Sequence, residues 1–211
     1  MKDIYKLFHR GNLPHIFPED TPIFITYNLK LNSPEKLKQL LSNKKKEYYT
    51  NKKLSYDQVY KFEFQLFDLY DQHLSKNISP RWLMQADLAE IVQISLIFGN
   101  EKFYDLHCFC IMPNHVHVLL TLKKKDVNPH SLPYIMQNHK RFTARKCNQL
   151  LDRTGQFWHR EYFDHYCRTE EEFNSIVWYI LNNPVKAKLI KNWQEWKFTW
   201  IDESLLRNIG V

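Results

Sequence analysis

The chain has 211 residues, of which 44% are hydrophobic, and this suits one domain with a buried core. No apolar run reaches the length of about 18 residues that a membrane span needs, and the N-terminal residues lack the apolar core of a signal peptide. We therefore expect no membrane association and a cytoplasmic location. The four cysteines fit reduced thiols better than a disulfide framework.

The formal net charge is +7, and the charge is unevenly placed. Residues 123–200 carry 14 Lys and Arg against 8 Asp and Glu, and aromatic residues make up 15% of the chain. Cations that attract phosphates, combined with rings that stack on bases, are typical of proteins that bind single-stranded nucleic acid. A generic basic protein with an aromatic core would have the same composition, so motifs must separate the two.

The first half of the chain predicts a strand, a helical insertion and a helix. Residues 21–31 are rich in β-branched and aromatic side chains, which is typical of a strand. Residues 34–76 have helical spacing, and we interpret the segment at about 33–79 as a helical insertion or arm. Residues 85–99 have an amphipathic helical pattern, with Gly99 suited to the C-terminal cap.

The second half predicts a hairpin followed by helices. In order, it predicts strands over 102–112 and 115–122, a basic helix over 131–151, a partly extended aromatic stretch over 157–169 and a helix over 170–184. Pro113 and Asn114 can turn the chain between the two strands. Pro184 disfavours helical geometry at Asn183, so the last helix is expected to end there. This order indicates an α+β fold with an antiparallel sheet packed with helices.

Two histidines stand in an apolar stretch, CFCIMPNHVHVLLTL. Side chains two residues apart in a strand share one face, so His115 and His117 point the same way while Val116 and Val118 point the other way. Imidazole is costly to bury without a partner. The pair is therefore a candidate for binding a metal ion, and the alternative is a hydrogen-bonded pair with a structural role.

Tyr179 and Asn183 are four residues apart in the last predicted helix. At about 100° per residue their side chains are nearly aligned, at the edge of the apolar stripe. If this helix packs on the face that carries His115 and His117, two imidazoles and an amide oxygen converge. Such a set suits Mn²⁺ or Mg²⁺, although the histidines alone would indicate zinc. A tyrosine beside a metal that polarises a phosphoryl group can act as a nucleophile; otherwise Tyr179 lies at the edge of the core and Asn183 caps the helix.

Several segments carry a resemblance to a known family. They are RGNLPHIFPEDTPIFITYNL, MPNHVHVLL, WHREYFDHYCR and YILNNPVKAKL. With these segments the chain resembles the REP-associated tyrosine transposases, which belong to the single-tyrosine HUH transposases together with the IS200/IS605 type. The resemblance covers residues 10–31 and 80–200, and it suggests one transposase domain over 1–211 that carries the insertion at about 33–79.

The resemblance implies both a fold and a reaction. The fold would be an RRM-like, ferredoxin-like antiparallel sheet backed by helices. His115 and His117 would bind the divalent metal with Asn183 as the third ligand, and Tyr179 would attack a phosphodiester of single-stranded DNA. The products would be a 5′-phosphotyrosine link and a free 3′-OH, and the reverse step would rejoin DNA. The implied partner is the hairpin DNA of repetitive palindromic elements with a flanking single-stranded tetranucleotide.

Seven further residues are candidate DNA contacts, chosen for charge or for a ring. Five are cations that could equally be solvated: Lys140, Arg141, Arg145, Arg160 and Arg168. Trp158 either stacks on a base or belongs to the core. His165 either orients the substrate or stabilises a loop.

Other functions stay open at this point. The same fold could serve as a catalytically silent nucleic-acid-binding module, or as an HUH nickase of the replication-initiator type. A zinc hydrolase is a more distant alternative. The helical insertion could extend the DNA contacts or support dimerisation, so we expect either a monomer or a homodimer.

Overall fold

The computed structural model describes residues 20–30, 56–76, 80–124, 130–160 and 162–208, together with 39 and 43. Its strands are β1 Pro22–Asn28, β2 Tyr104–Ile111, β3 His115–Leu122, β4 Phe163–Tyr166 and β5 Thr199–Ile201. Its helices are α2 Tyr56–Leu74, α3 Ala86–Gly99, α4 Leu132–Leu150, α5 Glu170–Leu181, α6 Asn183–Lys186 and α7 Glu203–Asn208, with 3-10 turns at Trp82–Met84 and Trp193–Glu195. No helix in the described part of the chain is long and apolar enough to cross a membrane.

The strands form one antiparallel sheet in the order β4-β1-β3-β2-β5. The first four strands have the order of a ferredoxin-like βαββαβ unit, in which β1 and β3 lie at the centre. This confirms the predicted α+β class with an antiparallel sheet. The predicted hairpin is confirmed as β2 and β3, and its register shifts once, between Leu106 and Cys108.

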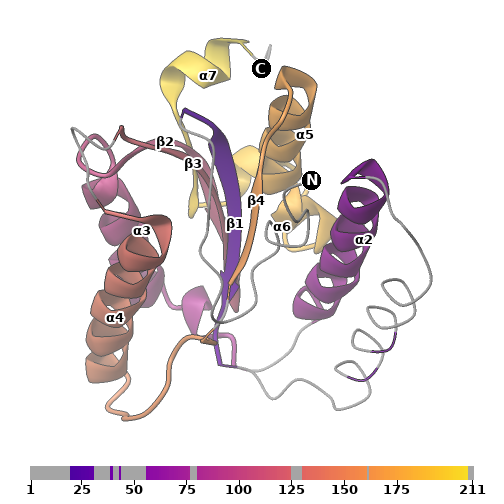
Figure 1. Ribbon diagram of the computed structural model, residues 1–211. Coiled ribbons are helices and arrows are strands. Elements are labelled where there is room, and N and C mark those ends of the chain that lie inside the picture. The colour runs from indigo at the N-terminus through magenta and orange to yellow at the C-terminus, as the bar shows by residue number, and fades with distance from the viewer. Residues whose placement is uncertain are drawn as a thin grey trace.

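Helices cover both faces of the sheet (Figure 1). Helices α3 and α4 pack on one face, in a core cluster that includes Val116, Val118 and Leu120. Helix α5 packs on the other face, where Phe24 and Leu119 are buried against Ile180 and its neighbours. Because successive side chains of β3 alternate between these clusters, each face of the sheet has its own apolar layer.

Helix α2 lies inside the predicted insertion and packs beside α5 and α6 on the same side of the sheet (Figure 1). Its Phe67 ring stacks on Phe163 of β4, with 4.2 Å between ring centroids, and meets the edge of Phe24 of β1. The part of the predicted helical segment that precedes residue 56 lies outside the described residues except for positions 39 and 43, which are helical. The extent of the insertion and the single domain over 1–211 stay predictions.

The last predicted helix ends earlier than expected. Helix α5 stops at Leu181, and Asn183 opens the separate short helix α6, so the prediction that one helix runs to Asn183 was wrong by two residues. Pro184 has no N–H to donate to the carbonyl of Ile180, which interrupts the helical ladder. In the first turn of α6 that missing donor costs nothing.

Gly99 ends α3, as predicted, but its role differs from that of a left-handed cap. It is the last helical residue, and the backbone N–H of the following Asn100 bonds to the carbonyl of Ile97. A Cβ at Gly99 would lie 2.2 Å from the hydroxyl oxygen of Tyr104. Tyr104 donates its hydroxyl to the carbonyl of Leu96 at 2.7 Å, so glycine is required for this close approach.

Candidate metal and nucleophile site

The β2–β3 hairpin places the two histidines at the centre of the sheet. His115 pairs with Asn28 and His117 with Thr26 of β1, and His117 also faces Cys110 of β2. Both histidine side chains are fully buried on the face covered by α5. Their ring centroids are 4.7 Å apart, so the predicted shared orientation is confirmed.

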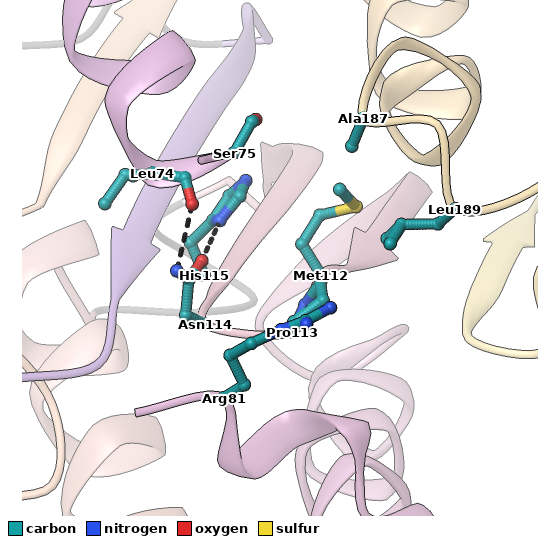
Figure 2. Close-up of a pocket in the computed structure, with 9 residues that line it drawn as sticks. All are labelled: Leu74, Ser75, Arg81, Met112, Pro113, Asn114, His115, Ala187 and Leu189. Atoms are coloured by element: carbon teal, nitrogen blue, oxygen red, sulfur yellow. Dashed lines mark hydrogen bonds between the residues drawn. The ribbon is translucent and has the colours of Figure 1, made fainter. Parts of the chain in front are cut away.

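Hydrogen bonds fix the orientation of both imidazoles. Asn114 donates its amide N–H to the carbonyl of Leu74 at 2.9 Å, which leaves its oxygen facing His115 Nδ1 at 2.6 Å (Figure 2). An amide oxygen only accepts, so Nδ1 of His115 carries the proton and Nε2 keeps a free lone pair. His117 Nδ1 lies 2.7 Å from the hydroxyl of Thr26, which leaves Nε2 of His117 turned to the same side. Metal-binding histidines are oriented by such bonds.

A third group, which the sequence did not reveal, completes a cluster. Asp71 of α2 is fully buried, and its Oδ1 lies 3.6 Å from His115 Nε2 and 3.3 Å from His117 Nε2. One ligand atom from each of the three residues falls within 4.8 Å of the others, so the group can hold a metal ion. A carboxylate with two imidazoles is a frequent donor set for divalent metals.

Four buried atoms support this interpretation because they have no hydrogen-bond partner within the described residues. They are Asp71 Oδ1, His115 Nε2, His117 Nε2 and Asn183 Oδ1. A buried polar atom without a partner is costly, and all four atoms carry lone pairs that a cation can accept. The residues present therefore fit a divalent metal.

Burial and mutual charge keep the histidine neutral and the carboxylate charged. Burial, together with the neighbouring His117, lowers the pKa of His115 to about 3, although Asp71 acts in the opposite direction. Burial acts to raise the pKa of Asp71, but attraction to His117 and His115 and the hydrogen bond from Tyr179 bring it well below its usual range. Neutral imidazole and ionised carboxylate are the forms that bind metals.

Helix α5 brings Tyr179 to this cluster. The helix begins at the Thr169 N-cap, whose hydroxyl accepts from the N–H of Glu172, and buries a stripe that includes Ile176 and Ile180 against the sheet. At the edge of that stripe the Tyr179 ring meets the His117 ring edge-on, with 5.6 Å between centroids. The tyrosine hydroxyl donates to Asp71 Oδ2 at 2.5 Å.

Asn183 lies one turn beyond Tyr179 and is fully buried. Its amide N–H donates to the backbone carbonyl of Tyr179 at 3.4 Å, and its Oδ1 is one of the four atoms without a partner. The predicted neighbourhood of Tyr179 and Asn183 is therefore present, although the helix breaks between them.

Charge around Tyr179 favours its protonated form in this structure. Burial, followed by the negative charge of Asp71, raises the pKa of Tyr179 well above its ordinary value of 10. The ammonium of Lys186 lies 5.1 Å from the centre of the Tyr179 ring and 3.9 Å from Asp71 Oδ2. A positive ion near Asp71 would oppose the effect of its charge.

The five cations among the predicted DNA contacts differ in their surroundings. Arg141, Arg145, Arg160 and Arg168 are exposed, and α4 carries the first two on the side of the sheet opposite the histidines. Lys140, by contrast, donates to the carbonyls of His159 and Arg160, at 2.6 Å and 2.9 Å.

The two remaining candidates, Trp158 and His165, are buried. The Trp158 ring packs against Tyr27, and its N–H donates to the Thr143 hydroxyl at 2.9 Å, so of the two interpretations the structure places it in the core. His165 Nε2 lies 3.0 Å from Glu172, which links β4 to the start of α5. The burial of Trp158 disfavours the other interpretation, in which its ring stacks on a base.

Asp71 could have been noticed from the spacing of its neighbours. Phe67, Asp71 and Leu74 stand at helical intervals of four and three, so an acidic residue interrupts an apolar stripe. Acidic residues are almost never fully buried unless paired. That signal would mark Asp71 as unusual, but only the folded chain shows that its partners are His115 and His117.

Comparisons with known proteins identify a family. Residues 76–183 match the family model described as Transposase IS200 like. A Haemophilus influenzae protein provisionally named REP-associated tyrosine transposase is 24% identical over 102 residues, which is 46% of this chain and 58% of that protein. The match therefore spans less than two thirds of that relative.

A solved structure of a REP-associated tyrosine transposase bound to a REP hairpin is similar in fold. It has a TM-score of 0.52 and 15% sequence identity, and the superposition covers 96% of this chain and 89% of that one. At this identity the likeness concerns the fold, and it agrees with the sheet order and with the helices on both faces.

Proposed function

The chain belongs to the IS200-like transposase family, and from that premise we propose that it cleaves and rejoins single-stranded or hairpin DNA with Tyr179 as the nucleophile. One observation carries the proposal. Three buried donor atoms, on Asp71, His115 and His117, lie together where α2 meets β3 and have no hydrogen-bond partner among the described residues, and the Tyr179 hydroxyl donates to the same Asp71 carboxylate. A core tyrosine with a purely structural role would not require such a cluster.

The cluster would hold Mg²⁺ or Mn²⁺ through His115, His117 and Asn183, with the carboxylate of Asp71 beside them. Mixed nitrogen and oxygen donors suit Mn²⁺, and carboxylate and amide oxygens suit Mg²⁺. When bound, the cation supplies positive charge that polarises a phosphoryl oxygen.

The reaction would exchange one phosphodiester bond for another. Tyr179 Oη bonds to phosphorus while the bond from phosphorus to the 3′ oxygen breaks. The tyrosine proton passes to a base, and the departing 3′ oxygen takes up a proton to give a free 3′-OH. The 5′ side stays linked to the protein as a phosphotyrosine, and attack by a 3′-OH on that link restores a DNA strand and the free tyrosine.

The DNA partner would be a hairpin of a repetitive palindromic element. The name of the Haemophilus influenzae relative and the hairpin in the structural neighbour support this choice. Arg141, Arg145, Arg160 and Arg168 are exposed cations that can contact phosphates. The cytoplasmic location and the choice between monomer and homodimer stay predictions.

Labelled oligonucleotides test the reaction directly. Single-stranded DNA carrying the repeat hairpins that flank the gene, labelled at the 5′ or the 3′ end, would be incubated with Mn²⁺ or Mg²⁺ and separated on denaturing gels. We expect a covalent protein–DNA band with the 3′-labelled strand that requires the metal and is absent with Tyr179→Phe. Binding without any adduct, in either metal, would instead indicate a catalytically silent DNA-binding module. Nicking without rejoining would indicate a nickase.

A further inference from the structure

Helix α2 contributes one side chain to the site from outside the part of the chain that matches the family model. The match begins at residue 76, and Asp71 precedes it. The family resemblance therefore assigns no role to Asp71, and its role has to be derived from its contacts in the fold.

The two oxygens of Asp71 face different partners. Oδ1 points to the Nε2 atoms of His115 and His117, at 3.6 Å and 3.3 Å, and has no hydrogen bond among the described residues. Oδ2 accepts the hydroxyl of Tyr179 at 2.5 Å. One carboxylate thus spans the distance between the metal-binding atoms and the nucleophile.

The surroundings hold this carboxylate in place. One turn before Asp71, Phe67 stacks on Phe163 and contacts the Tyr179 ring, with centroids 6.1 Å apart. After Asp71, the carbonyl of Leu74 accepts the amide of Asn114, which also orients His115 (Figure 2). Helix α2 is therefore fixed to the same residues that orient the metal ligand and the nucleophile.

We propose that Asp71 is a positioning residue that couples the bound metal to the nucleophile. Its Oδ1 ligates the cation, and its Oδ2 holds the Tyr179 hydroxyl beside it. The inference rests on the proposed function for the identity of the nucleophile. It adds that a residue of the insertion, and not only the HUH pair and Asn183, sets the position of Tyr179.

Asp71→Asn tests this link because it keeps the shape and removes the charge and one acceptor. The matched control is Asp68→Asn on the same helix, since Asp68 is 39% exposed and pairs with Lys186 instead of the histidines. The protein would be labelled with 3-fluorotyrosine, and the Tyr179 signal among the 12 tyrosines assigned by its loss in Tyr179→Phe. Thermal melts followed by circular dichroism would confirm that each variant is folded.

We expect Asp71→Asn to change both the position of the Tyr179 fluorine signal and the affinity for Mn²⁺. Without metal or DNA, D71N shifts the fluorine signal of Tyr179 by more than D68N does, because Asp71 accepts the tyrosine hydroxyl whereas Asp68 meets Lys186. Titrated Mn²⁺ broadens the same signal in the wild type, and D71N needs about tenfold or more Mn²⁺ for equal broadening. At saturating Mn²⁺, D71N also forms the DNA adduct more slowly than D68N.

The proposal is overturned if D71N and D68N give the same signal position and the same Mn²⁺ titration. It is also overturned if the Mn²⁺ affinity falls but the Tyr179 signal stays, because Asp71 would then be a ligand without a link to the nucleophile. If the wild type shows the expected shifts and broadening but never forms an adduct, the proposed reaction fails while the placement of Asp71 is supported.

Discussion

His115 and His117 depend on partners that come from distant parts of the chain. Thr26 and Asn114 hold their Nδ1 atoms, and Asp71 faces their Nε2 atoms. Each imidazole is thereby fixed in one orientation, which a metal site needs because a free ring would lose entropy on binding. Metal binding at this site therefore depends on the orientation of the two rings as well as on the identity of the ligands.

Asn114→Ala should weaken metal binding without removing a ligand. The substitution frees His115 Nδ1 and breaks the bond to the Leu74 carbonyl, so the ring is no longer held. We expect Mn²⁺ affinity to fall by about 10- to 100-fold in isothermal titration calorimetry. Asn182→Ala is the control, since among the described residues the Asn182 amide donates to the carbonyl of Trp178, in the helix that Asn182 caps. Equal affinities for the two variants would refute the role of Asn114.

His139 predicts how stability depends on pH. Burial, with a smaller effect of Lys140, lowers its pKa to about 3, and its nitrogens bond to the hydroxyls of Tyr27 and Ser95. Below about pH 6.5 His139 binds a proton in the unfolded chain but stays neutral in the folded chain. The free energy of unfolding therefore falls as the pH falls from about 6.5 towards 3.

Urea unfolding of wild type and His139→Gln between about pH 4.5 and pH 7 measures this effect. The slope of the unfolding free energy against pH should be shallower in the variant, by up to about 1.4 kcal/mol per pH unit for one proton. Parallel slopes would show that His139 does not contribute.

Local patterns predicted most elements, and tertiary contacts explain the exceptions. Helices α3 and α4 follow from a helical period, because each buries one face against the sheet, whereas β2 and β3 are apolar runs on either side of a turn and are covered on both faces. The shared face of His115 and His117 follows from the two-residue period of a strand, and the proximity of Tyr179 and Asn183 follows from the period of a helix. Asp71 was missed because its partners lie more than 40 residues further along the chain. The sequence allowed Trp158 either to stack on a base or to belong to the core, and only its packing in the folded chain favours the core.

Gly99→Ala tests the close contact between Gly99 of α3 and the Tyr104 side chain of β2. Alanine favours a helix by up to about 1 kcal/mol, but its Cβ would lie 2.2 Å from the hydroxyl oxygen of Tyr104. We expect overpacking to prevail and the free energy of unfolding to fall by about 1 to 2 kcal/mol in urea unfolding. In a Tyr104→Leu background the same change should be neutral or stabilising. A loss of equal size in both backgrounds would exclude the clash as the cause.

On the scale of the whole molecule, the sheet separates the candidate metal site from two of the predicted DNA contacts. The candidate metal site lies on the face covered by α2 and α5, whereas α4, which carries Arg141 and Arg145, lies on the opposite side (Figure 1). The sequence predicted this α+β layout and its basic helix, but not the separation of the predicted cations from the histidines. If α4 binds the hairpin, DNA must contact the protein on both sides of the sheet.

The double variant Arg141→Gln, Arg145→Gln should therefore weaken hairpin binding and leave Mn²⁺ affinity unchanged. Each lost phosphate contact should reduce the slope of log affinity against log salt by about 0.7 to 0.9. Fluorescence anisotropy with a labelled hairpin at several salt concentrations measures both quantities. The exposed Arg207→Gln is the control. An unchanged salt slope would remove these two arginines from the DNA interface.

The most direct test of the central claim is peptide mass spectrometry of the protein after incubation with a hairpin oligonucleotide and Mn²⁺. The account predicts that the peptide containing Tyr179 carries the 5′ phosphate of the cleaved strand, and that omission of the metal removes this mass. A nucleotide attached to Tyr162 or Tyr166, or no attached nucleotide although the hairpin is bound, would contradict the assignment of Tyr179 as the nucleophile.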